Sequence, residues 1–150
     1  MQIPLSEIKD IVTIAGVAIG AGSLFVATIN ARMTSKTNRA RHWLDLRTQF
    51  AKHDEVHRNL RRPGGKWAGS SPGPVTAEEW AMVEAYMGLF EHCESMLAEK
   101  LIDTATFKAI YEYRLKNIVA SNAIKTEKLV KRADGWRLFL GLLKRVGIQI

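Results

Sequence analysis

The sequence is poor in several kinds of residue, and each shortage narrows the class of protein. It has one cysteine, four prolines and only 8% aromatic residues in a chain of 150. A single cysteine excludes an intramolecular disulfide framework and a cysteine-rich zinc site. With 47% hydrophobic and 25% charged residues, the chain fits neither a disordered tail nor a collagen-like repeat. Its length is that of one domain.

Charge is missing from one long stretch near the start of the chain. Residues 11–31 read IVTIAGVAIGAGSLFVATINA and would form a helix of about 31 Å, which matches the hydrocarbon thickness of a bilayer. A cleaved signal peptide would need a basic start and a shorter apolar run, whereas this start carries Glu7 and Asp10. We therefore expect an uncleaved transmembrane helix over residues 11–31, with a buried core helix as the remaining alternative.

The basic residues on either side of this segment predict its orientation. Lys9 is the only base before it, and four bases follow it closely: Arg32, Lys36, Arg39 and Arg41. Because Lys and Arg are retained on the cytoplasmic side, residues 1–10 should lie outside and the rest of the chain in the cytoplasm. We expect a single-pass protein of the bacterial inner (plasma) membrane, in which these four bases contact anionic phospholipid headgroups.

Small residues form a stripe along the expected transmembrane helix. Its members are spaced by three or four residues: Gly16, Gly20, Ser23 and Ala27. Small residues on one face let two helix backbones approach closely, so the stripe predicts self-association. The alternative is that Gly and Ala are simply common in such helices.

Helical periodicity dominates the rest of the chain, and no strand pattern stands out. An apolar stripe predicts a helix over about 38–61. Residues 62–75 are rich in Gly and Pro, which predicts a flexible surface loop. Thr76 and Glu79 have the spacing of a capping box, so a helix should begin there.

Two further helices are expected after this one. Asp103 is a good N-cap, and the helix it opens should bury one apolar face. That face is made of Phe107, Ile110, Tyr111, Arg114 and Ile118. The final segment, 135–148, has an apolar face flanked by bases, so that it either packs on the bundle or lies on the bilayer.

The fold class predicted is all-α: a single N-terminal transmembrane helix followed by a small cytoplasmic helical bundle. The expected divisions are a short extracytoplasmic start, the transmembrane helix, a basic juxtamembrane region with the first cytoplasmic helix, the loop, and a helical domain with an amphipathic C-terminal helix. Their bounds are 1–10, 11–31, 32–61, 62–75 and 76–150.

The net charge of +7 raises the question of a nucleic-acid partner. The bases lie mainly before residue 67 and after residue 124, on either side of an acidic middle. They form no recognisable nucleic-acid motif, and the expected anchor explains the first cluster. We therefore predict no nucleic-acid partner.

Two short motifs suggest catalysis but fail on inspection. Residues 69–73 match G-x-S-x-G, yet Pro72 lacks the N–H that the oxyanion hole would need. Gly65 and Lys66 resemble part of a phosphate-binding loop, but Leu60 and Trp67 stand where Gly and Ser or Thr are required.

His53 and His57 have the i, i+4 spacing of two zinc ligands. A third ligand would have to come from the next helix, which carries His92, Cys93 and Glu94. Interhelical packing of the two rings is the simpler interpretation. We predict no catalytic residue, no metal site and no cofactor.

The stretch from Trp80 to Arg114 resembles an uncharacterised bacterial family of small proteins with one N-terminal membrane anchor and a cytoplasmic helical domain. Three elements carry the resemblance: Phe90-Glu91 in mid-helix, the Leu101-Ile102-Asp103 turn, and Phe107 at the opening of the next helix. The resemblance implies this architecture and no established activity. It also highlights Glu91, for which an ion pair with Arg114 or another base is the simplest role.

The function expected from these features is a non-enzymatic, membrane-anchored interaction or scaffold protein. It would bind an unidentified protein partner and associate with itself. One alternative is a small membrane effector of the toxin or phage-exclusion type, which would act by oligomerising in the bilayer. Another is a metal-assisted enzyme using His53 and His57.

Overall fold

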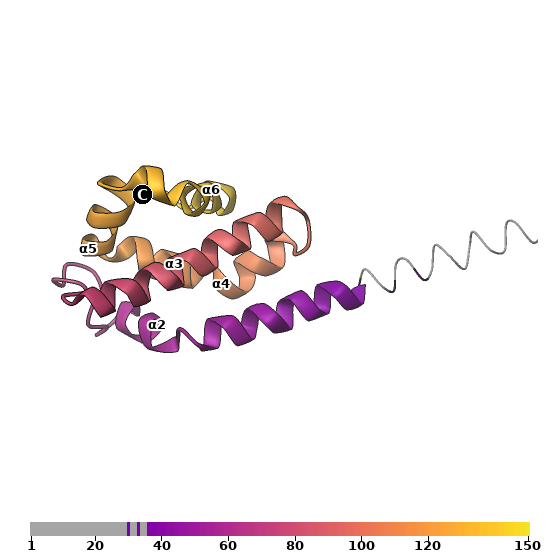
Figure 1. Ribbon diagram of the computed structural model, residues 1–150, viewed down its shortest axis with the longest axis horizontal. Coiled ribbons are helices and arrows are strands. Elements are labelled where there is room, and N and C mark those ends of the chain that lie inside the picture. Colours follow the sequence, from indigo (N-terminus) through magenta and orange to yellow (C-terminus); the bar gives the residue numbers. More distant parts are fainter. Residues whose placement is uncertain (1–29, 31–32, 34–35) are drawn as a thin grey trace, which may run out of the picture. The chain divides into compact units, whose positions relative to one another are not determined.

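A computed structural model describes Asn30, Met33 and residues 36–150 of the chain (Figure 1). The transmembrane helix expected over residues 11–31 lies outside the described residues except for Asn30, and so do all four residues of the small-residue stripe. Among the helices that are described, none has the length and apolar character needed to cross a membrane.

The chain divides into two compact units, Met1–Arg41 and His42–Ile150. In the first unit, residues 36–41 are helical, and the side chains of Lys36, Arg39 and Arg41 are exposed. Arg32 is outside the described residues. The second unit contains the helical bundle and every feature discussed below.

The bundle begins with a helical segment over residues 42–51 and continues through five α-helices, a π-helix and a 3₁₀ turn. Within residues 36–150 the regular structure is helical and no strand occurs, so the all-helical prediction is confirmed for this region. The elements are α2 (Asp54–Leu60), α3 (Ala77–Ala98), α4 (Thr104–Ala120), α5 (Asn122–Ile124), the π-helix η1 (Lys125–Val130), the 3₁₀ turn η2 (Ala133–Trp136) and α6 (Arg137–Val146).

α3 runs through the middle of the bundle, between α6 and α2 (Figure 1). Val83, Tyr86, Met87, Phe90 and Cys93 of α3 are fully buried, as expected for a helix covered on most sides. Aromatic rings from several helices meet around Phe90, whose centroid lies 4.9 Å from that of Phe50 and 6.1 Å from that of Phe139. Phe90 therefore connects the N-terminal segment of the bundle with α6.

The helix expected over 38–61 is interrupted, which corrects its predicted extent. The backbone turns at Lys52 and His53, where N–H groups bond to carbonyls three residues earlier, and α2 starts at Asp54. The break has no signature in the apolar spacing, because the residues on both sides of it still reach the core. Phe50 and Leu60 are each 1% exposed.

The predicted helix starts are confirmed at α3 and α4. The hydroxyl of Thr76 accepts a hydrogen bond from the Glu79 N–H, and the Glu79 carboxylate accepts one from the Thr76 N–H. At α4 the Asp103 carboxylate accepts a hydrogen bond of 2.7 Å from the Thr106 N–H. These caps satisfy N–H groups that a helix leaves without an internal partner, which is why they can be recognised from sequence.

The Gly/Pro-rich segment over 62–75 has no helix or strand, as expected, but it is not a detached surface loop. Trp67 in its middle is fully buried in the core, and its backbone N–H donates a hydrogen bond of 2.7 Å to the Asn59 carbonyl. Further along the loop, the Gly69 carbonyl accepts a hydrogen bond of 2.8 Å from the backbone N–H of Asn122. The prediction of a flexible surface loop did not take Trp67 into account. Burial of its large side chain stabilises the loop against the bundle, although the loop backbone is irregular.

Residues 122–136 form helical turns that the sequence pattern did not predict. The π-helix η1 directs Lys128 inward, where its side chain is only 6% exposed. The Lys128 ammonium forms an ion pair with Glu84 and lies 4.7 Å from the centroid of the Trp80 ring. The partners come from α3, so nothing local to residues 122–136 could reveal this burial.

α6 packs against α3, which decides between the two positions considered for the C-terminal helix. Phe139, Leu142, Leu143 and Val146 on its apolar face are buried. Arg145 closes its far end with hydrogen bonds of 2.7–3.0 Å to both carboxylate oxygens of Glu94, which is itself buried.

Candidate functional site

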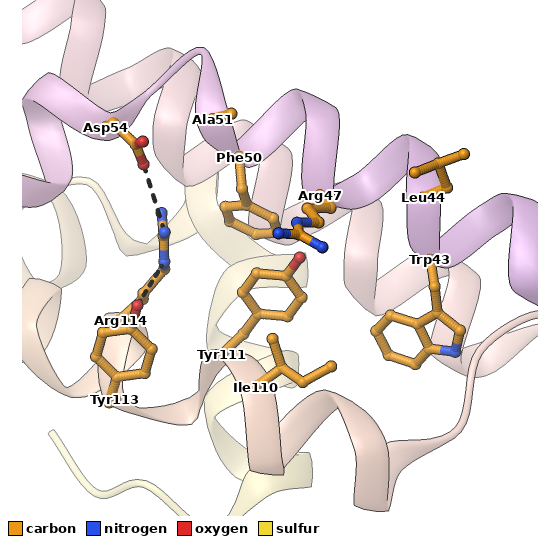
Figure 2. A pocket seen from close by; sticks show the side chains of 10 residues that line it. All are labelled: Trp43, Leu44, Arg47, Phe50, Ala51, Asp54, Ile110, Tyr111, Tyr113 and Arg114. Atoms are coloured by element: carbon orange, nitrogen blue, oxygen red, sulfur yellow. Dashed lines mark hydrogen bonds and ion pairs between the residues drawn. The ribbon is translucent and has the colours of Figure 1, made fainter.

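A groove of about 710 Å³ runs along the bundle between the segment 43–54 and α4 (Figure 2). One wall is formed by residues 43–54, and the other by four residues of α4 within positions 110–114. The lining residues are Trp43, Leu44, Arg47, Phe50, Ala51, Asp54, Ile110, Tyr111, Tyr113 and Arg114. The Phe50 and Tyr111 rings stack within the lining, with centroids 4.1 Å apart.

Large apolar side chains remain exposed on both walls of the groove. Leu44 is 64% exposed on one wall, while Ile110 and Tyr113 are 44% and 49% exposed on the other. Trp43 is partly buried against the core at the same end as Leu44. Single exposed apolar residues are ordinary, but several that converge on one concavity are typical of binding surfaces.

Arg114 marks the opposite end of the groove. Its Nε donates a hydrogen bond of 3.1 Å to the Tyr113 hydroxyl, and its Nη2 lies 3.4 Å from an oxygen of Asp54. The guanidinium also lies over the Phe50 ring, 5.5 Å from the centroid. The contact with Asp54 is longer than the 2.7–2.9 Å usual for a charge-assisted hydrogen bond, so this ion pair is loose.

The inner side of Arg114 faces buried polar groups. Burial disfavours the Arg114 cation, but the oxygens of Tyr86 and Tyr113 outweigh this effect and raise its pKa. Burial lowers the pKa of His57, and the positive charge of Arg114 lowers it further. At neutral pH Arg114 therefore stays charged, whereas the lowered pKa of His57 favours its neutral form.

Arg47 projects into the middle of the groove from the wall that carries Leu44. Its guanidinium has no hydrogen bond and no ion pair with any described residue, although its charge acts on Tyr111, whose pKa is raised chiefly by burial. The negative charge of Asp54 compensates that of Arg114, so the charge of Arg47 is the one positive charge among the described residues of the groove lining that stays uncompensated.

The groove lining offers apolar and charged side chains for contacts with a ligand. A nucleophile would need a base within hydrogen-bond reach, and the groove lining contains neither cysteine, serine nor histidine. In the part of the chain that the structure describes, no group of three or more His, Cys, Asp or Glu side chains is placed to hold a metal ion.

The two histidines that the sequence suggested as ligands contact different aromatic rings. The ring of His53 lies 5.7 Å from that of Tyr86, whereas His57 lies 5.3 Å from Tyr113 in an edge contact. Both histidines thus pack against aromatic rings. Cys93 is fully buried, and burial raises its thiol pKa to about 12, which keeps it protonated.

Glu91 does not form the ion pair expected from the sequence. Its carboxylate accepts a hydrogen bond from the Phe139 N–H in the first turn of α6, and Arg114 pairs with Asp54 instead. Ser71 of the G-x-S-x-G match lies in a stretch without helix or strand, so it has no nucleophile elbow around it.

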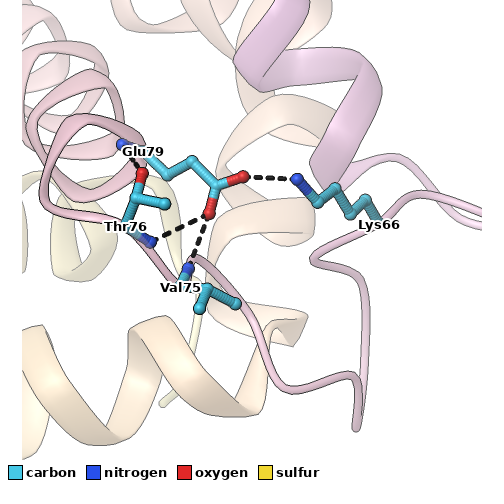
Figure 3. A network of polar contacts seen from close by, with 4 residues as sticks. All are labelled: Lys66, Val75, Thr76 and Glu79. Atoms are coloured by element: carbon cyan, nitrogen blue, oxygen red, sulfur yellow. Dashed lines mark hydrogen bonds and ion pairs between the residues drawn. The ribbon is translucent and has the colours of Figure 1, made fainter.

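A second polar network lies far from the groove lining and anchors the loop (Figure 3). Glu79 accepts hydrogen bonds from the N–H groups of Val75 (2.6 Å) and Thr76 (3.2 Å), and it forms an ion pair with Lys66. These contacts lower the Glu79 pKa to about 2, with the Lys66 contact as the largest cause. The network fixes the start of α3 against the loop.

The sequence analysis named three residues of the groove lining, Ile110, Tyr111 and Arg114, but it placed them on a buried helix face and did not predict a groove. Ile110 was expected in the core but is exposed, while Tyr111, its neighbour on α4, is buried. Leu44 and Arg47 lie off the predicted apolar stripe and carried no prediction. The signal in the sequence was Leu44, an apolar residue beside Trp43 and off the apolar stripe. The sequence could not show that α4 forms the opposite wall, because that depends on how the helices pack.

No protein-family model matches the chain, and the chain shows no significant similarity to a curated protein or to a solved structure. The likeness of Trp80–Arg114 to an uncharacterised family therefore stays a prediction. Over residues 36–150 the chain forms a helical bundle with a groove along one side.

Proposed function

We propose that this chain is a non-enzymatic scaffold that is tethered to the bacterial inner membrane and holds a partner protein in the groove between residues 43–54 and α4. The observation that carries the proposal is that one groove has three exposed apolar residues in its lining, Leu44, Ile110 and Tyr113, in a bundle whose other large apolar residues are mostly buried. Removing this apolar surface from water would stabilise a complex.

The tether in this proposal is the apolar segment 11–31, with the N-terminus outside and the bundle in the cytoplasm. Trp43 follows Ala31 by only 12 residues, which span no more than about 40 Å even when fully extended. Whatever the groove holds would therefore stay close to the membrane. Exposed Lys36, Arg39 and Arg41 are available to anionic headgroups near the surface.

Self-association through the transmembrane segment is a further part of the proposal. It rests on the spacing of Gly16, Gly20, Ser23 and Ala27. Replacing Gly16 and Gly20 together by Ile should lower the oligomer mass measured in mild detergent. An unchanged mass would refute this part while leaving the groove proposal intact.

The partner can be sought by site-specific photo-crosslinking in the native host. A photoreactive amino acid placed at Leu44 of the full-length protein should crosslink one discrete protein, which mass spectrometry would identify. The matched control places the same group at Leu138, which is 49% exposed on α6 and outside the groove. Equal crosslinking from both positions, or none from Leu44, would contradict the proposal.

A variant test complements the crosslink. Leu44→Asp should abolish co-purification of the crosslinked protein, because a carboxylate at this place would have to be desolvated on binding. Leu138→Asp should leave co-purification unchanged. Both positions are exposed, so neither variant should unfold the bundle, and circular dichroism can verify this directly.

A further inference from the structure

We propose that the occupant of the groove is an amphipathic helix of the partner protein that places an acidic side chain against Arg47. The inference rests on the proposed function, namely that the groove binds a protein. It adds the chemical class of the bound segment and the residue that selects it.

The dimensions of the groove favour a helix. Its longer wall extends from Trp43 to Asp54, and the helical part of this wall, residues 43–51, rises by about 12 Å, or more than two turns. Apolar contacts occur on both walls, at Leu44 on one side and at Ile110 and Tyr113 on the other. A helix with apolar residues at i, i+3 or i+4, and i+7 presents one stripe to such a groove and satisfies its own backbone hydrogen bonds.

The charge of the groove favours an acidic residue within that stripe. Arg114 is held by Tyr113 and loosely by Asp54, whereas Arg47 has no ion pair with any described residue. When a helix covers the groove, Arg47 loses water, and a partner carboxylate would then compensate it. Guanidinium groups bind carboxylates through two parallel hydrogen bonds, which fixes the geometry as well as the charge.

The same features disfavour a second copy of this chain and a lipid chain. In a two-fold dimer the same patch faces itself, so the net positive grooves of two copies would meet. An acyl chain could cover Leu44 and Ile110 but would leave Arg47 without a counter-charge. Both occupants remain outcomes of the test described next.

The probe is a displayed library of helical peptides about 16 residues long, selected against the full-length protein in nanodiscs. Selected peptides are then synthesised, and their dissociation constants are measured by fluorescence anisotropy. For each peptide, every acidic residue on the apolar side is changed to Gln and to Lys. The protein variants are Arg47→Glu, Leu44→Asp, and the controls Arg58→Glu and Leu138→Asp, which alter exposed residues outside the groove.

We expect amphipathic peptides with an acidic residue to be enriched and to bind about tenfold more tightly than their Gln forms. Arg47→Glu should reverse the preference, so that the Lys form binds best. Leu44→Asp should reduce binding of all forms by at least about tenfold, whereas Arg58→Glu and Leu138→Asp should not.

The outcomes separate this inference from the proposed function. Peptides that need Leu44 but bind equally well as Glu and Gln forms would overturn the acidic preference and leave the groove as a protein-binding site. Peptides insensitive to Leu44→Asp, or no selected peptides at all, would overturn both. A Leu44-dependent dimer or retained lipid in native mass spectra, with no peptide competition, would assign the groove to those occupants and overturn the inference.

Discussion

The carboxylate of Glu91 on α3 accepts a hydrogen bond of 3.2 Å from the backbone N–H of Phe139 in the first turn of α6. Within the described structure, Trp136, the N-cap residue of α6, makes no side-chain cap bond, so Glu91 supplies the missing cap from another helix. The negative charge also lies at the positive end of the α6 dipole. A residue highlighted by a family resemblance thus has a structural role in docking α6.

This role predicts the stability of Glu91 variants. Glu91→Ala should lower the free energy of unfolding by about 1–2 kcal/mol, because the first turn of α6 loses its cap. Glu91→Gln should lose less, since the amide oxygen still accepts the bond but the charge is gone. Urea unfolding monitored by circular dichroism measures both, with exposed Glu99→Ala as the control. Equal stability of Glu91→Ala and wild type would exclude the capping role.

The Glu79 network predicts a specific pH dependence. Its pKa in the folded protein is lowered from 4.5 to about 2 by Lys66 and by the N–H groups of Val75 and Thr76. Because the folded value lies below the unfolded one, the stabilising contribution of Glu79 is present above about pH 4.5 and is lost as the pH falls toward 2.

The measurement compares wild type with Glu79→Gln across this range. The difference in their urea midpoints should be largest above about pH 4.5 and should shrink as the pH falls toward 2, where Glu79 begins to be protonated in the folded state as well. Glu78→Gln, at the adjacent exposed position of the same helical turn, is the matched control. A difference that stays constant with pH would contradict the assignment.

Burial of Trp67 predicts that the Gly/Pro-rich loop is part of the folded core. Trp67→Ala should lower the free energy of unfolding by about 3–5 kcal/mol, and trypsin should then cleave faster at Lys66. Val75→Ala is the control, because Val75 is 74% exposed in the same loop and its truncation should cost little. If Trp67→Ala is too unstable to purify, Trp67→Phe should show the same trend with a smaller loss. Rapid cleavage of the wild-type loop would contradict this prediction.

Cys93 gives a direct probe of core opening, because it is the only cysteine in the sequence. Its burial and a thiol pKa of about 12 predict that a disulfide reagent reacts no faster than the protein unfolds. Leu138→Cys introduces an exposed thiol on α6 and should react at once with one equivalent, followed by a slow second phase. Fast reaction of native wild type would show that the core around Cys93 opens locally.

Features set by neighbouring residues were predictable from the sequence. The capping box of Thr76 and Glu79 and the cap of Asp103 act over three residues, so their patterns locate the starts of α3 and α4. The family likeness and the membrane segment stay predictions.

Features that depend on a partner element were missed or assigned wrongly. Glu91 was expected to meet a base and instead meets a backbone N–H of α6. Lys128 lies in a π-helix and is buried against α3, although lysine is ordinarily exposed. Ile110 was expected in the core, but α4 turns Tyr111 inward and leaves Ile110 in the groove.

The sequence by itself determined that α3, α4 and α6 are helices and where α3 and α4 begin, because these properties depend on contacts within one or two helical turns. The tertiary structure decided which helices face each other, and with them the groove, the burial of Trp67 and the docking of α6. Those outcomes depend on how all the faces of the bundle fit together at once, since a close-packed core admits few arrangements and no single helix encodes its neighbours.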